Sequence, residues 1–218
     1  MGVDLDWELR NAVMHNKMEV IADLLSMGAD VHARGDKQRT PLHIVTQVDV
    51  AKLLIDAGAD VNARDHGFMT PLFLAALSGN INLTKFLLEM GADVDIQTQD
   101  GSTILHEAAI WQGAPMVTLL LNAGAKIDLK NVAGAMPFTN AVFAGELDTV
   151  KLFLDRGADP LVCNKSGQNA FDLAKKLERD EVLAVFEAWQ EVRDQKAIHA
   201  CNIERLDKMI KTRRKPGV

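Results

Sequence analysis

The sequence has few of the residues that build disulfide frameworks or zinc sites. Its 218 residues include only two cysteines, Cys163 and Cys201, which form neither a CxxC motif nor a ligand-like spacing with any histidine. Disulfide frameworks and structural zinc sites need several such residues at short, regular spacings. We therefore interpret both cysteines as free thiols and expect no metal.

Long apolar runs are also missing. No stretch of about 18 apolar residues occurs, and the N-terminal sequence MGVDLDWELR has neither the basic nor the apolar region of a signal peptide. The sequence therefore predicts an intracellular protein without membrane insertion, located in the cytoplasm. The basic C-terminal cluster KTRRKPGV would also fit nuclear import, or else is a solvated tail.

Basic residues are outnumbered by acidic ones, and the net charge is −6. Nucleic-acid binding relies on lysine and arginine to neutralise phosphates, so we expect no nucleic-acid partner. With 48% apolar and 25% charged residues, the composition is that of an ordinary soluble protein with a hydrophobic core.

Sequence motifs of catalysis and cofactor binding are not found either. The chain contains no P-loop, no Gly-x-Gly-x-x-Gly, no Gly-x-Ser-x-Gly and no HExxH motif. We therefore expect no enzyme and no cofactor.

A repeat fills most of the chain. Gly-Ala-Asp or a near match begins at Gly28, Gly58, Gly91, Gly124 and Gly157, in steps of 30, 33, 33 and 33 residues. Thr-Pro-Leu-His and related tetrapeptides keep the same rhythm, beginning at residues 40, 70, 103, 136 and 169. The sequence resembles the ankyrin-repeat family, whose period is 33 residues and whose signature includes Thr-Pro-Leu-His; the resemblance covers about residues 4–188.

The residues of one unit predict a pair of helices. Threonine followed by proline suits a helix start, so a first helix begins near Thr70. A second apolar helix follows, and Gly91 supplies the left-handed residue that ends it. The segment after Gly91 is expected to form a hairpin-like loop. The resemblance also implies that His43 and His106 make structural hydrogen bonds near the threonine of the motif.

We predict an all-α ankyrin-repeat solenoid of about six stacked helix–turn–helix repeats, with a C-terminal helical extension. One pair cannot bury its apolar face alone, so neighbours must stack. The repeat domain is residues 1–188, its first and last repeats act as caps, and residues 189–218 form a C-terminal helix and basic tail. The repeats are assigned to residues 7–36, 37–66, 67–99, 100–132, 133–165 and 166–188.

The second repeat is three residues short. Alignment with the third repeat places the missing residues around Gln47–Val48, at the turn between the two helices. Either a surface turn tolerated a deletion, or the deletion makes a step in the binding face for one partner.

The resemblance implies a site for a protein partner, on the concave face formed by loop tips and the exposed ends of the first helices. Exposed aromatic and apolar residues are typical of such sites. The alternative is that Leu77, Ile110 and Phe143 turn inward and thicken the core. The candidate partner-binding residues are Arg39, Phe68, Met69, Leu77, Asp100, Ile110, Trp111 and Phe143.

The predicted function is protein–protein recognition by a monomer. An alternative is an adaptor or inhibitory subunit that also binds a second protein through its C-terminal helix, where apolar residues recur at helical spacing. An enzyme or small-ligand binder is a third reading, and it requires a closed polar pocket.

Overall fold

The computed structural model describes residues 4–195 of the chain. The secondary structure of these residues is helical, and no strand occurs among them. Within the same residues, no helix is long and apolar enough to cross a membrane.

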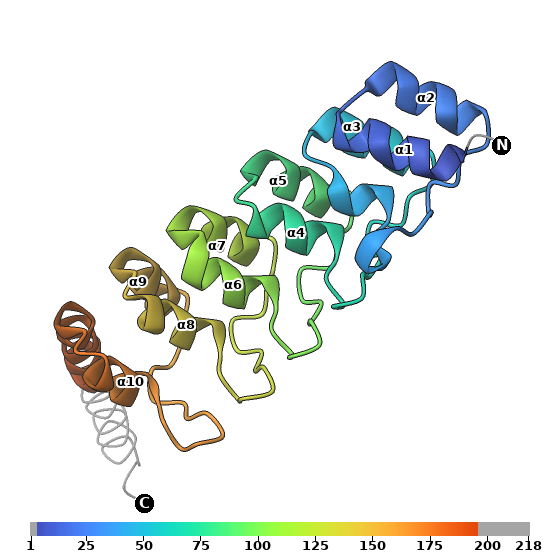
Figure 1. Cartoon of the computed structure of the whole chain (residues 1–218). Coiled ribbons are helices and arrows are strands. Elements are labelled where there is room, and N and C mark those ends of the chain that lie inside the picture. The colour runs from blue at the N-terminus through green and yellow to red at the C-terminus, as the bar shows by residue number, and fades with distance from the viewer. Residues whose placement is uncertain (1–3, 196–218) are drawn as a thin grey trace, which may run out of the picture.

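The helices come in pairs joined by short turns (Figure 1). We call the two members of a pair the first helix and the second helix. The elements are α1 (Leu5–Met14) with α2 (Met18–Ser26), η1 (Asp36–Gln38), η2 (Pro41–Ile44) with α3 (Val48–Asp56), α4 (Pro71–Leu77) with α5 (Ile81–Glu89), α6 (Ile104–Trp111) with α7 (Gly113–Asn122), α8 (Pro137–Ala144) with α9 (Leu147–Asp155), and α10 (Ala170–Lys176), which is followed by helical residues 180–195.

The predicted helix start and stop signals are confirmed in the third repeat. The Thr70 hydroxyl accepts a hydrogen bond from the Phe73 N–H at 3.2 Å, and Pro71 is the first residue of α4. At the other end, Gly91 has a φ of 86°, and the N–H of Ala92 bonds back to the carbonyl of Leu87 at 3.0 Å. This pattern is a Schellman ending, which requires a left-handed residue and therefore favours glycine.

The pairs stack side by side in one row from the N-terminus to the C-terminus, and the long loops all project to the same side (Figure 1). Each first helix from α4 to α10 packs on the next first helix, and α7 packs on α9 in the second layer. The all-helical fold of stacked pairs expected from the sequence is thus confirmed.

The hydrophobic core follows the row. One cluster of buried side chains extends from Leu9 to Ala92, and another from Phe73 to Phe186. The two adjoin in the third pair, where Leu88 and Val94 pack against both. Neighbouring pairs therefore bury each other's apolar faces, as the repeat pattern requires.

The shortening of the second repeat lies in its first helix, so the predicted position at the turn is wrong. Three residues, 78–80, connect α4 to α5, and three residues, 45–47, likewise connect η2 to α3. The connections are equally long, whereas η2 has four residues and α4 has seven. The second repeat therefore has a single 3₁₀ turn where the third repeat has a helix.

The reason is the rise per residue. Leu42 and Val50 are both buried, so each end of the short segment must keep its place in the stack. An extended residue spans about 3.3 Å, against about 1.5 Å in a helix. Val45, with ψ at 142°, is extended, and this conformation lets fewer residues cover the distance.

The last helix runs on past the predicted domain boundary. Residues 180–195 are helical without a break, up to the end of the described residues, so position 188 falls inside a helix. The second helix of the last pair and the beginning of the predicted C-terminal helix are therefore one element. The rest of the predicted C-terminal helix and the basic tail, residues 196–218, lie outside the described residues.

Candidate protein interface

The ends of three consecutive first helices carry large apolar side chains. We call these residues, Leu77 in α4, Ile110 and Trp111 in α6, and Phe143 in α8, the apolar stripe. Trp111 is 68% exposed and Phe143 is 55% exposed, while Leu77 and Ile110 are half-buried. The inward alternative therefore holds in part for Leu77, which packs against the core, and fails for Phe143.

The periodicity of α6 explains why Trp111 is exposed. Leu105, Ala108 and Ala109 are buried, so they define the face of α6 that packs against the neighbouring pairs. Glu107 and Trp111 are four residues apart and lie together on another face. Trp111 is held away from the core by the helix that carries it.

The tips of the long loops form a row beside the first helices. Backbone bonds join successive tips: the N–H of His66 donates to the carbonyl of Lys37 at 2.8 Å, and the N–H of Val132 donates to the carbonyl of Asp100 at 2.9 Å. These bonds fix the tips relative to one another, so they present a defined surface rather than independent loops.

Phe68 stands at a tip in a backbone conformation that favours glycine. Its φ is 61°, and Gly101, Gly134 and Gly167 have the corresponding left-handed conformation in later tips. A bulky residue with positive φ is a conformational outlier, and such outliers cluster at functional sites. The Phe68 side chain is 45% exposed, and the neighbouring Met69 is half-buried.

Arg39 already has a partner within the chain. Its Nε donates to Oδ2 of Asp65 at 3.1 Å, and the Asp65 side chain is almost fully buried. The other oxygen of Asp65 accepts from the backbone N–H groups of Gly67 and Met69. Arg39 thus stabilises the next loop tip. The sequence did not reveal this pair, because the two residues lie 26 positions apart, at opposite ends of one repeat.

Asp100 is held as a carboxylate at the tip before α6. It accepts hydrogen bonds from the hydroxyl groups of Thr98 and Ser102 and from the Ser102 N–H. The Thr98 hydroxyl is the main reason why the pKa of Asp100 is lowered. Asp100 is exposed and carries a fixed negative charge.

Glu107 is a half-buried carboxyl group beside the stripe. Burial raises its pKa, and the nearby charge of Asp100 raises it further, while the Trp111 side chain acts in the opposite direction. Sequence reasoning overlooked Glu107, because its position in the motif gave no sign of its neighbours.

The two motif histidines connect neighbouring repeats. In His43 the Nδ1 atom accepts from the Thr40 N–H at 3.1 Å, and in His106 the Nδ1 atom accepts from the Thr103 N–H at 3.0 Å. The structural hydrogen-bond role expected for both is thus confirmed. Burial lowers the pKa of each imidazole. No group of potential metal ligands occurs among residues 4–195.

The N-terminal pair has an exposed aromatic residue that the sequence reasoning passed over. Trp7 and Met14, seven residues apart in α1, both line a hollow of about 270 Å³, and Asp36 of the first loop tip lines it too. Trp7 stands where the motif has threonine, so the motif drew no attention to it. Its spacing to Met14, two helical turns, is the signal that places both on one face.

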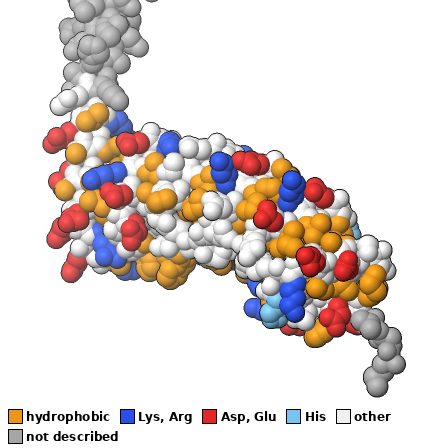
Figure 2. Space-filling model, turned by 90° about the horizontal axis from the view of Figure 1, so that it is seen from above, with side chains coloured by type: hydrophobic (Ala, Val, Ile, Leu, Met, Phe, Trp, Pro, Cys, Tyr) orange, Lys and Arg blue, Asp and Glu red, His pale blue; other side chains and the backbone are white. Residues whose placement is uncertain are grey.

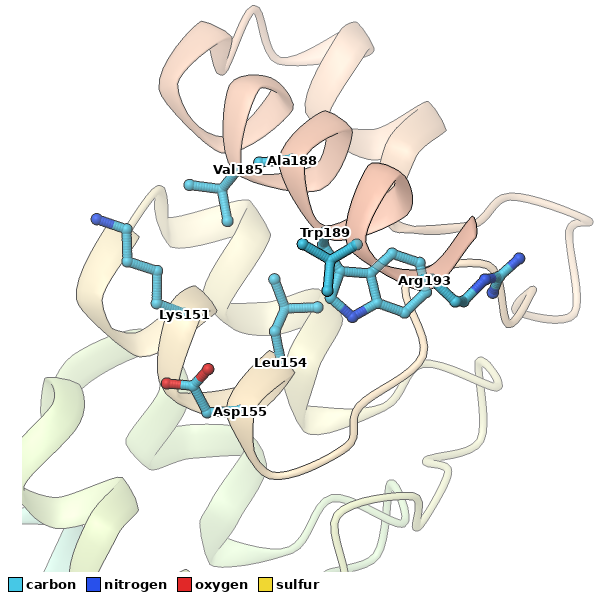
Figure 3. Close-up of a pocket in the computed structure, with 8 residues that line it drawn as sticks. Lys151, Leu154, Asp155, Val185, Ala188, Trp189 and Arg193 are labelled. Carbon is cyan, nitrogen blue, oxygen red and sulfur yellow. The ribbon is translucent and has the colours of Figure 1, made fainter. Parts of the chain in front are cut away.

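A larger hollow of about 520 Å³ lies between α9 and the helical residues 180–195 (Figure 3). Leu154 and Trp189 lie in it, and the Arg193 guanidinium lies 4.9 Å from the centre of the Trp189 ring. Seen from above, the molecule shows acidic, basic and apolar side chains interspersed, without a continuous basic surface on that face (Figure 2).

The family of the protein follows from this architecture and from a comparison with family models. The model described as ankyrin repeats, in three copies, matches residues 9–98 and residues 47–131. These matches overlap and together cover more than half of the 218 residues. The chain therefore belongs to the ankyrin-repeat family. A comparison with curated proteins gives no match.

Ankyrin repeats are generally protein–protein interaction modules, and the fold is known as a non-enzymatic one. The matched residues include most of the candidate interface, from Arg39 to Trp111, whereas Phe143 lies beyond them.

Proposed function

We propose that this protein recognises another protein through a concave face made of the apolar stripe and the loop tips, and that it has no catalytic activity of its own. One observation carries the proposal: Trp111 and Phe143 are large aromatic side chains, yet they are 68% and 55% exposed at the ends of stacked first helices. Side chains exposed to this extent add little to the packing of the core.

The physical argument is the cost of exposed apolar surface. A contiguous exposed apolar patch marks an interaction site, and aromatic residues are enriched among those that dominate binding energy. Ile110, beside Trp111 in α6, and Leu77, at the end of the preceding first helix α4, are half-buried and would extend the apolar surface around Trp111. Phe68, at a loop tip, would contact the same partner from the side.

The test replaces Trp111 by alanine. We expect the melting temperature to stay within a few degrees, because an exposed side chain contributes less than about 1 kcal/mol to stability. Loss of a residue that is buried in the interface costs about 2 kcal/mol or more of binding free energy. Affinity for the partner protein should therefore fall roughly thirtyfold. Adding Phe143→Ala should weaken binding further, although neighbours in one patch need not be additive.

Met90→Ala is the matched control. Met90 is an exposed apolar residue that follows the second helix α5, away from the apolar stripe. The Met90→Ala variant should have the melting temperature and the partner affinity of the wild type. If Trp111→Ala binds as the wild type does, the partner uses another face; if the variant unfolds, Trp111 belongs to the core.

A further inference from the structure

The carboxyl group of Glu107 and the ring of Trp111 lie side by side on the exposed side of α6. The two residues are one helical turn apart in α6, and a hydrogen bond from the Trp111 side chain to the Glu107 carboxylate acts to lower the pKa of Glu107. Asp100, at the loop tip before α6, is close enough to influence both Glu107 and His106 electrostatically. A carboxyl group, a second carboxylate and an exposed aromatic ring therefore share one small region of the surface.

In the described part of the chain, no ion pair balances the negative charge of this region. Three ion pairs occur among residues 4–195, and they are Arg39 with Asp65, Lys85 with Glu89, and Lys126 with Asp95. Neither Asp100 nor Glu107 belongs to one. Asp100 keeps its charge because hydroxyl and N–H groups bond to it. Glu107 is half-buried, next to the half-buried Ile110, in surroundings that disfavour its charge.

We propose that the bound partner places an arginine or lysine against the carboxylate of Glu107 and over the exposed face of the neighbouring Trp111 indole ring. This inference rests on the proposed function and specifies the chemistry of the partner: a basic residue flanked by large apolar residues. The cation would neutralise the charge of Glu107, and its free face would stack on Trp111. The flanking apolar residues would contact Ile110 and Phe143, on either side of the cation.

Charge complementarity favours this occupant over a neutral or acidic one. A carboxylate beside an aromatic face attracts a cation through two interactions: an ion pair with the carboxylate and a cation–π contact with the negative face of the ring. Arginine suits the place better than lysine, because its planar guanidinium both bonds to a carboxylate and stacks on an aromatic ring. An acidic segment would meet two like charges, Asp100 and Glu107, while losing its own hydration.

The test selects peptides from a random displayed library on the purified full-length protein. Selected peptides are then measured against the wild type, Glu107→Gln and Trp111→Ala. We expect the peptides to carry arginine or lysine beside large apolar residues and to lose about tenfold in affinity on Glu107→Gln or on replacement of their basic residue by glutamine. Binding should be lost on Trp111→Ala. Glu187→Gln removes the same charge from an exposed position in the helical residues 180–195 and should bind as the wild type does.

The outcomes separate this inference from the function on which it rests. Peptides that lose binding on Trp111→Ala, but lack a basic residue or bind Glu107→Gln unchanged, would overturn the cation site and leave the docking face standing. Peptides that bind Trp111→Ala as well as the wild type, or a selection that yields none, would count against both.

Discussion

The imidazole of His106 bonds to the backbone carbonyl of Ala135, in the loop tip that precedes the next first helix, with 3.1 Å between Nε2 and the oxygen. Since Nδ1 of the same ring accepts from the Thr103 N–H, the proton of the neutral ring must sit on Nε2 and be donated to Ala135. His43 makes the same pair of bonds, to Thr40 and to Met69. Neutral histidines therefore hold neighbouring repeats together.

The first prediction is that mild acid destabilises the fold through these histidines. Burial lowers the pKa of His43 and of His106 below the ordinary value of 6.5. The unfolded chain then binds more protons than the folded chain, so this part of the stability is complete above pH 6.5 and is lost as the pH falls from 6.5 toward the lowered pKa. Urea unfolding at about pH 7.5 and about pH 5.5 should show the loss.

His106→Phe is the matched variant, because Phe73 occupies the corresponding position of α4 and is buried there. On acidification, the free energy of unfolding of this variant should fall less than that of the wild type. Glu107, with its raised pKa, contributes in the opposite direction at lower pH, and the comparison of the two proteins removes that contribution. An equal loss in both would show that His106 does not titrate as its contacts require.

The second prediction concerns a buried hydroxyl group. The Oγ1 atom of Thr84 is buried and has no hydrogen-bond partner within the described residues 4–195. Thr84 is the fourth residue of α5, and the fourth residue of α9 is Val150. Thr84→Val keeps the shape and removes an unsatisfied polar group, so the free energy of unfolding should rise by about 1 kcal/mol. Chemical denaturation measures it.

Thr139→Val provides the control in the opposite direction. The Thr139 hydroxyl donates to the carbonyl of Met136 at 2.6 Å, so its removal should lower the free energy of unfolding by about 1 kcal/mol. If Thr84→Val destabilises the protein as Thr139→Val does, Thr84 has a partner that its surroundings do not show.

The sequence predicted the features that depend on neighbours along the chain. The helix start at Thr70 and the left-handed Gly91 are local, because a cap needs only the next few residues. The pair of Arg39 and Asp65 and the proximity of Asp100 to Glu107 depend instead on how loops and helices stack, which spacing alone does not show. The exposure of Trp111 was predictable from its position, whereas the motif left open whether Leu77 is exposed or turns inward.

The third prediction is that Phe68 weakens the fold while serving the interface. A non-glycine residue in the left-handed region costs about 1 kcal/mol, so Phe68→Gly should raise the free energy of unfolding by about that amount. Under the proposed function it should also weaken partner binding, because an exposed ring is removed. Denaturation and binding are measured on the same preparation.

Phe68→Ala separates the two effects. Alanine has a Cβ atom and therefore keeps the backbone strain at a φ of 61°, but it removes the ring. Binding should fall without a gain in stability. A glycine variant with wild-type affinity would place Phe68 outside the interface. A glycine variant that is less stable than the wild type would mean that the ring supports the loop tip.

The last prediction concerns the shortened second repeat. Inserting Ala-Ala-Leu after Ile44 copies Ala75 to Leu77 of α4 and should extend the 3₁₀ turn η2 into a helix. Ala75 and Ala76 are buried in α4, so the inserted alanines should take the place of the buried Val45 in the core. We therefore expect the free energy of unfolding to change by about 1 kcal/mol or less, with a small gain in helical circular dichroism. Affinity should stay unchanged, because the apolar stripe lies in α4, α6 and α8.

The same three residues inserted after Ala51 are the control. That position is inside α3, whose buried Leu54 would be rotated away from the core, so this variant should be strongly destabilised. The result that decides between the two views of the short repeat is the affinity of the first variant. Full affinity means that a tolerated deletion trimmed the first helix. A large loss of affinity at unchanged stability means that the partner contacts the second repeat beside Thr46, where η2 is three residues shorter than α4.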